Sequence, residues 1–149
     1  MLKALVPVDG TDNSLAAIRH VVKLAHGRES LEIHLLTVEP GLPGHATRHV
    51  SQELLEGYRR DEAEKVLAPA RAILAQAGLA GEEHVRVGHV AHVIAETARS
   101  LHCDIVVMGT HGFGTVTQLL LGSVSHEAIH LMDPAIPVTL VKAASHDPT

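Results

Sequence analysis

The fold is decided by residues 104–125, which read DIVVMGTHGFGTVTQLLLGSVS. Residues 105–108 form a continuous apolar run, which predicts a parallel strand that is covered on both faces. A glycine-rich segment follows, and residues 122–125, Gly-Ser-Val-Ser, have the character of a helix start. Glycines let backbone N–H groups approach an anion, serine hydroxyls donate to phosphate oxygens, and a helix start adds the positive end of a dipole. The stretch therefore predicts a phosphate site between a strand and a helix.

The glycines of this stretch have a defined spacing. Two residues separate Gly109 from Gly112, nine residues separate Gly112 from Gly122, and Ser123 follows directly. In this pattern the chain resembles the universal stress protein family, whose ATP-binding branch carries Gly-x2-Gly-x9-Gly and then Ser or Thr after its fourth strand. The resemblance covers almost the whole chain, about residues 1–142, and it implies a single domain of that family.

Apolar runs and helical periodicities alternate along the chain. The expected strands are residues 2–8, 31–38, 83–87, 105–108 and 136–142. Four helices are expected. The first begins at the cap-forming residues 11–14 and ends just before Gly27, and the second spans about 49–77 and ends just before Gly78. The third spans about 90–101, and the fourth runs from 124 to just before Pro134. One face of the long helix is expected to carry Val50, Leu54, Tyr58, Val66, Ala70, Ile73 and Ala77. Pro69 is expected to kink this helix or to remove one hydrogen bond.

This alternation predicts an α/β fold with a parallel sheet and right-handed crossovers. The resemblance implies a doubly wound, Rossmann-like, five-stranded sheet in the order 3-2-1-4-5, flanked by helices. Its switch point then lies between strands one and four, and ligands of such sheets bind at the carboxyl ends of the strands beside the switch. Asp9 and Gly109 stand at those two ends, so the topology and the glycine motif point to one cleft. Residues 143–149 are expected to form a disordered tail.

Asp9 has two interpretations. At a strand end its carboxylate can contact a ribose or a bound metal ion, or it can cap the helix or turn that follows. In the family, an Asp at this position contacts the nucleotide; the resemblance also implies that the backbone of Val38 meets the adenine and that Pro7 lies near the base. His111 is a hypothetical phosphate contact when it is protonated. The predicted nucleotide site consists of Pro7, Val8, Asp9, Val38, Met108, Gly109, His111, Gly112, Gly122, Ser123, Val124 and Ser125.

Positive charge is missing from the motif segment. Phe113 stands where many relatives carry Arg or Lys, and no Lys or Arg occurs between Arg99 and Lys142. Fast phosphoryl transfer needs cationic stabilisation of its transition state, so we expect ATP, or ADP or AMP, to be bound with slow or no hydrolysis and without a dedicated catalytic activity. Mg²⁺ or Mn²⁺ would supply the counterion, with Asp9 as the metal ligand.

The expected function is that of an ATP-binding universal stress protein that acts as a nucleotide-dependent stress sensor or regulator. One alternative is an ATPase or another adenine-nucleotide enzyme of the same superfamily. A second is a dimeric interaction module without bound nucleotide, which Phe113 and the missing cations favour. Relatives dimerise by antiparallel pairing of their fifth strands, and the apolar residues 136–141 at the predicted sheet edge predict a homodimer here. A protein partner is expected, which the sequence does not identify.

Composition limits the remaining classes. The chain has 149 residues, 46% of them apolar and 19% charged, which is typical of a single soluble globular domain. Its formal net charge of −5 and its single Tyr and single Phe argue against a surface for nucleic acid or for an anionic membrane. There is no signal-peptide pattern and no apolar run of about 18 residues. Cys103 is alone, which favours a reducing compartment, and we expect the cytoplasm.

The chain contains 13 histidines, an unusual number. His45 and His49, and likewise His89 and His92, are spaced so that each pair could place two imidazoles on one helical face. The sequence shows no third ligand for either pair, so surface polar residues are the expected interpretation.

Overall fold

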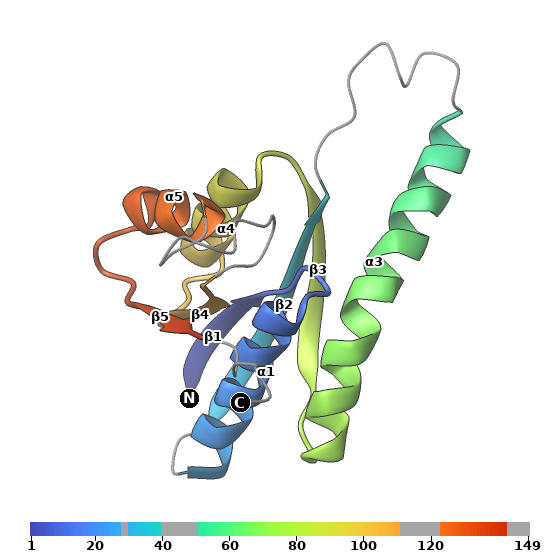
Figure 1. Cartoon of the computed structure of the whole chain (residues 1–149). Coiled ribbons are helices and arrows are strands. Elements are labelled where there is room, and N and C mark those ends of the chain that lie inside the picture. The colour runs from blue at the N-terminus through green and yellow to red at the C-terminus, as the bar shows by residue number, and fades with distance from the viewer. Residues whose placement is uncertain (28–29, 40–50, 111–122, 143–149) are drawn as a thin grey trace, which may run out of the picture.

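Five strands form one parallel sheet in the order β3-β2-β1-β4-β5 within residues 1–27, 30–39, 51–110 and 123–142, which the computed structural model describes (Figure 1). The strands are β1 (Leu2–Pro7), β2 (Leu31–Glu39), β3 (Gly81–Val87), β4 (Ile105–Gly109) and β5 (Val138–Val141). The helices are α1 (Asp12–Gly27), α3 (Gln52–Gln76), α4 (Val90–Ser100) and α5 (Ser123–Leu131). Because β1 pairs with both β2 and β4, the predicted strand order and the doubly wound, Rossmann-like fold are confirmed.

The sheet has an apolar layer on each face. Helices α1 and α3 cover one face, and α4 and α5 cover the other (Figure 1). Successive side chains of a strand point to opposite faces, so Val6 of β1 packs in the layer of α1 and α3, while Leu5 packs in the layer of α4 and α5. In β4, Val107 and Met108 divide in the same way. The continuous apolar runs of the sequence therefore correspond to strands that are buried on both sides.

Helix α3 differs from its predicted form. Its buried residues are Leu55, Ala63, Leu67, Ala70 and Leu74. The predicted face was wrong at Leu54 and Tyr58, which are 70% and 56% exposed. The first turns of α3 extend past the end of the sheet, so side chains there have little to pack against (Figure 1). The helix continues through Pro69, and Gly78 ends it with a φ of +74°, as predicted.

Other boundaries shift by a few residues. Gly27 is the last residue of α1 instead of the first residue beyond it, and β3 begins at Gly81, two residues before the predicted start. β5 is shorter than predicted and begins after Pro137, whose carbonyl accepts a hydrogen bond from the Val106 amide at 3.0 Å. None of the helices in the described ranges combines the length and the apolarity that crossing a bilayer would require.

Candidate functional site

The carboxyl ends of β1 and β4 lie side by side at the switch point, where β1 pairs with β4 on one side and with β2 on the other. Asp9 follows β1, and Gly109 is the last residue of β4. Helix α1 begins just after Asp9, and the described part of α5 begins at Ser123. The structure thus brings together two of the predicted ligand-binding positions and the starts of two helices.

Asp9 is built into the turn that leads into α1. Its Oδ1 accepts hydrogen bonds from the amide of Thr11 at 2.9 Å and from the Thr11 hydroxyl at 2.5 Å. Its own amide donates to the hydroxyl of Ser14 at 3.2 Å. Between them, Gly10 has a φ of +84°, a backbone conformation that favours glycine. The turn role weighed for Asp9 is therefore observed, and its carboxylate is only half-buried.

Thr11 caps α1. Its hydroxyl accepts from the amide of Ser14 at 3.3 Å, and its carbonyl accepts from the Ser14 hydroxyl at 3.0 Å and from the Leu15 amide at 3.1 Å. These bonds fix the first turn of α1 at the switch point. A helix start carries amide groups without intrahelical partners and a positive dipole end, which favour an anion at this edge of the sheet.

Gly109 has a packing role that the motif alone did not reveal. A Cβ atom on Gly109 would lie 2.5 Å from the carbonyl oxygen of Asn13 and 2.8 Å from its carbonyl carbon. Both are backbone atoms of the first turn of α1. Only a residue without a side chain therefore lets α1 approach the end of β4 so closely.

Ser125 ties α5 to the same residue. Its hydroxyl is fully buried and donates to the carbonyl of Gly109 at 2.9 Å. Ser123, two residues earlier, is exposed, and Val124 is half-buried. The start of α5 is thus held at the end of β4 with Ser123 facing solvent, whereas the Ser125 hydroxyl is engaged inside the protein.

The apolar members of the predicted site lie below this edge. Pro7, Val8, Val38 and Met108 are all buried, and the Val8 amide donates to the carbonyl of Leu36 at 2.7 Å. Their side chains belong to the core, so they offer a ligand mainly their backbone. The remaining predicted residues, His111, Gly112 and Gly122, lie outside the described residues.

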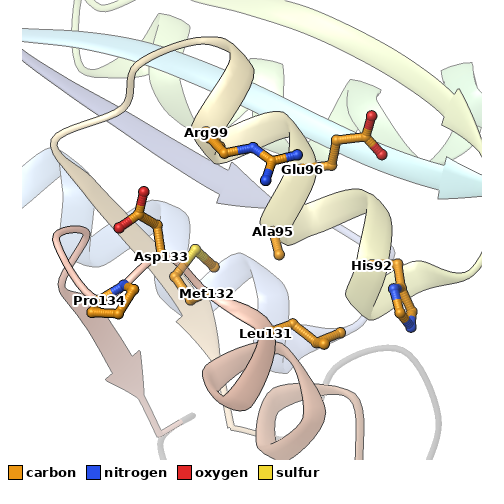
Figure 2. A pocket seen from close by; sticks show the side chains of 8 residues that line it. All are labelled: His92, Ala95, Glu96, Arg99, Leu131, Met132, Asp133 and Pro134. Carbon is orange, nitrogen blue, oxygen red and sulfur yellow. The ribbon is translucent and has the colours of Figure 1, made fainter.

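A cavity of about 470 Å³ lies between α4 and the end of α5 (Figure 2). His92, Glu96 and Arg99 of α4 line one side of it, and Met132 and Asp133 follow α5 on the other. Among the residues that the structure describes, none of those predicted for the nucleotide site lines this cavity. It is therefore separate from the edge formed by β1 and β4.

The histidine pair at the start of α4 has a neighbour that the sequence did not indicate. His89 Nε2 lies 2.9 Å from Oε1 of Glu127, and His92 Nε2 lies 3.9 Å from the same oxygen. The sequence did not indicate Glu127 as a neighbour of this pair, because it lies on α5, more than thirty residues along the chain. All three side chains are largely exposed to solvent. The other pair, His45 and His49, lies outside the described residues.

Known proteins match this chain over nearly its full length. Residues 1–142 match the model of the universal stress protein family. The chain is 31% identical over 144 residues to universal stress protein MJ0531 of Methanocaldococcus jannaschii, covering 94% of this chain and 81% of that protein. It is 33% identical over 141 residues to a universal stress protein of Thermus aquaticus, covering 93% of this chain and 96% of that protein.

Solved structures share the fold. Protein MJ0577 superimposes with a TM-score of 0.78 at 25% identity, and the match covers 97% of both chains. A universal stress protein solved in complex with cAMP gives a TM-score of 0.70 at 22% identity, covering 96% of this chain and 98% of that one. One from Archaeoglobus fulgidus, in complex with dAMP, gives 0.69 at 22% identity, covering 95% and 98%. With the family match across residues 1–142, these findings show that the chain belongs to the universal stress protein family.

Proposed function

We propose that this chain binds an adenine nucleotide, foremost ATP, at the carboxyl ends of β1 and β4, and that it acts as a nucleotide-dependent stress sensor or regulator in the cytoplasm. The observation that carries the proposal is the start of α5, which Ser125 fastens to Gly109 while Ser123 stays exposed. A helix start with an exposed serine, beside the switch point of a doubly wound sheet, is suited to phosphate. Relatives solved with cAMP and with dAMP support an adenine ligand.

In this proposal the site residues divide by role. The phosphates contact Gly109, Gly112, Gly122, the hydroxyl of Ser123 and the amides of Val124 and Ser125, with His111 nearby. The adenine and ribose lie against the backbone of Pro7, Val8, Val38 and Met108. Asp9 holds Mg²⁺ or Mn²⁺, because the sequence between Arg99 and Lys142 offers no Lys or Arg to balance the phosphates.

The same lack of cations favours binding over catalysis. A phosphoryl-transfer site stabilises its transition state with Lys, Arg and metal ions, and here a metal ion would have to act alone. We therefore expect hydrolysis that is slow or absent, so that the bound nucleotide is a signal and not a substrate. ATP turnover well above that of a Ser123→Ala variant would instead favour an enzyme.

The test is calorimetric titration of ATP into wild-type protein, Ser123→Ala and the control Ser30→Ala. Ser30 is an exposed serine that precedes β2, at the opposite end of the sheet. Losing one charge-assisted hydrogen bond costs about 1.5–3 kcal/mol, so Ser123→Ala should weaken binding by roughly one to two decades. Ser30→Ala should bind like wild type. Equal affinity of the two variants, or no ATP binding by wild type at millimolar concentration, would refute the proposal.

The proposal includes a homodimer formed through β5. This strand lies at an edge of the described sheet, and Val138 and Leu140 are half-buried. An edge strand presents unpaired backbone groups that a second copy can pair with. Sedimentation should show a dimer for wild type and a monomer for Val138→Lys; a wild-type monomer at micromolar concentration would contradict this part alone.

A further inference from the structure

Four polar residues gather on the face of the sheet that α4 covers, away from the ends of β1 and β4. Glu32 and His34 alternate on β2, on the same face as Leu36, which packs in the layer of α4. On β3, Glu82 pairs in register with His34, and His84 pairs with Leu36. Residues paired in a parallel ladder share a face, so all four side chains belong to one surface.

The donor atoms of this cluster converge. Nδ1 of His34 lies 2.8 Å from Nε2 of His84 and 3.6 Å from Oε2 of Glu82. One ligand atom each from His34, Glu82 and His84 can be chosen so that all lie within 4.8 Å of one another. His34 is only 3% exposed, whereas the Glu82 side chain is 67% exposed, so the cluster has a fixed inner member and an open side.

Glu32 determines which nitrogen of His34 is available. Its Oε2 lies 2.6 Å from Nε2 of His34, and because a carboxylate can only accept, Nε2 carries the proton. In the neutral ring, Nδ1 then carries a lone pair, which faces Nε2 of His84 at 2.8 Å and is free of a proton that a metal ion would have to displace. A carboxylate that orients a histidine in this way is the usual partner behind a metal-ligating imidazole.

We propose that His34, Glu82 and His84 bind a divalent transition-metal ion of the Zn²⁺ type, with Glu32 as the supporting carboxylate and solvent as the remaining ligand. Two imidazoles and one carboxylate are a known donor set for Zn²⁺, with an open position left for water. Mg²⁺ prefers oxygen donors, so the two nitrogens select against it. This metal site is distinct from the proposed nucleotide site at the carboxyl ends of β1 and β4. Its ligands come from β2 and from β3, so a bound ion would link these two strands.

The experiment is calorimetric titration of Zn²⁺ into the metal-free, full-length protein without nucleotide. All proteins carry His92→Gln, which disrupts the exposed group of His89, His92 and Glu127. Within this background, Glu32→Gln should weaken Zn²⁺ binding by about 10–100-fold, the effect of losing an outer partner, and His84→Gln by more, because it removes a ligand. His26→Gln, at the exposed end of α1, is the matched control and should bind like the background protein.

Two further readouts separate the metal site from a hydrogen-bonded histidine pair. Co²⁺ should give the visible absorption of a tetrahedral complex in the background protein and lose it in His84→Gln. Zn²⁺, but not Mg²⁺, should raise the melting temperature of the background protein. If His84→Gln fails to fold, Glu82→Gln, which changes a largely exposed side chain, replaces it. Zn²⁺ binding that is absent, or equal in the background protein, Glu32→Gln and the ligand variant, would overturn the proposal and leave the His34–His84 contact as a hydrogen bond only.

Discussion

Replacing Gly109 with alanine tests the contact on which the geometry of the site depends. The added Cβ would lie 2.5 Å from the carbonyl oxygen of Asn13, a distance at which atoms cannot remain. The neighbour is backbone in the first turn of α1, so no side chain can rotate away. Either α1 or the end of β4 must move, and such overpacking costs about 1–3 kcal/mol. For a chain of this size the melting temperature should fall by roughly 2–12 °C.

The matched control is Gly57→Ala. Gly57 lies inside α3, and a Cβ there would have nothing within 4 Å. Alanine is favoured over glycine in a helix interior by about 0.5–1 kcal/mol, so this variant should melt roughly 1–4 °C higher than wild type. The same chemical change should thus have opposite signs at the two positions.

The measurement is thermal unfolding of both variants without nucleotide, followed by circular dichroism. If Gly109→Ala melts at or above the wild-type temperature, the close approach of α1 to β4 is wrong. The interpretation of Gly109 as a packing residue then fails, whether or not the variant binds ATP. If Gly57→Ala also destabilises, the free-energy difference at Gly109 cannot be assigned to Asn13.

Two of the three remaining predictions concern the same edge of the sheet, and the third concerns Cys103, which lies at the other end of β4. Ser125→Ala removes the buried donor to the Gly109 carbonyl, so it should lower the free energy of unfolding by about 1–3 kcal/mol in a urea titration; an unchanged midpoint would contradict the bond. Asp9→Asn keeps an oxygen for the Thr11 amide but loses the negative charge. The melting temperature should therefore hardly change, whereas Mg²⁺ should no longer strengthen ATP binding. Equal ATP affinity of the wild-type protein in Mg²⁺ and in EDTA would refute the metal role of Asp9. Burial raises the pKa of the Cys103 thiol to about 11, so at pH 8 the native protein holds roughly 100-fold less thiolate than an exposed cysteine. Iodoacetamide should therefore label Cys103 slowly until urea is added, and equal labelling rates in both conditions would contradict the burial.

Much of the fold could be predicted because it rests on local patterns. The run at residues 105–108 is apolar without alternation, and β4 is covered on both faces. The strand order required the family resemblance, since alternation alone predicts a parallel sheet but not its sequence of neighbours. The face of α3 was misjudged at Leu54 and Tyr58 because helical spacing does not reveal where the sheet ends.

The candidate site was predictable in position but only partly in its contacts. Asp9 and Gly109 follow from strand ends, yet the closeness of Gly109 to Asn13 is a contact across almost a hundred residues that no local spacing encodes. His34 and His84 are 50 residues apart and meet only through the register of β2 and β3. The repeated pattern Glu-x-His on both strands, at Glu32 and Glu82, was the available signal. The nucleotide-binding roles of all the predicted site residues stay predictions, and His111, Gly112 and Gly122 also lie outside the described residues.

Gly109 contacts a helix in each of the two layers that cover the sheet. Its missing side chain leaves room for the backbone of α1 on one face of the sheet, and its carbonyl holds Ser125 of α5 on the other. A displacement at the start of α5 would therefore act on Gly109, the residue against which α1 packs. Hydrogen bonds through Thr11 and Ser14 connect the turn of Asp9 to the first turn of α1, so this turn would move together with α1. Binding of a molecule to the outer surface of α5 would therefore be coupled to the position of α1 on the opposite face of the sheet. This contact is a short route by which binding on one face could change the other face.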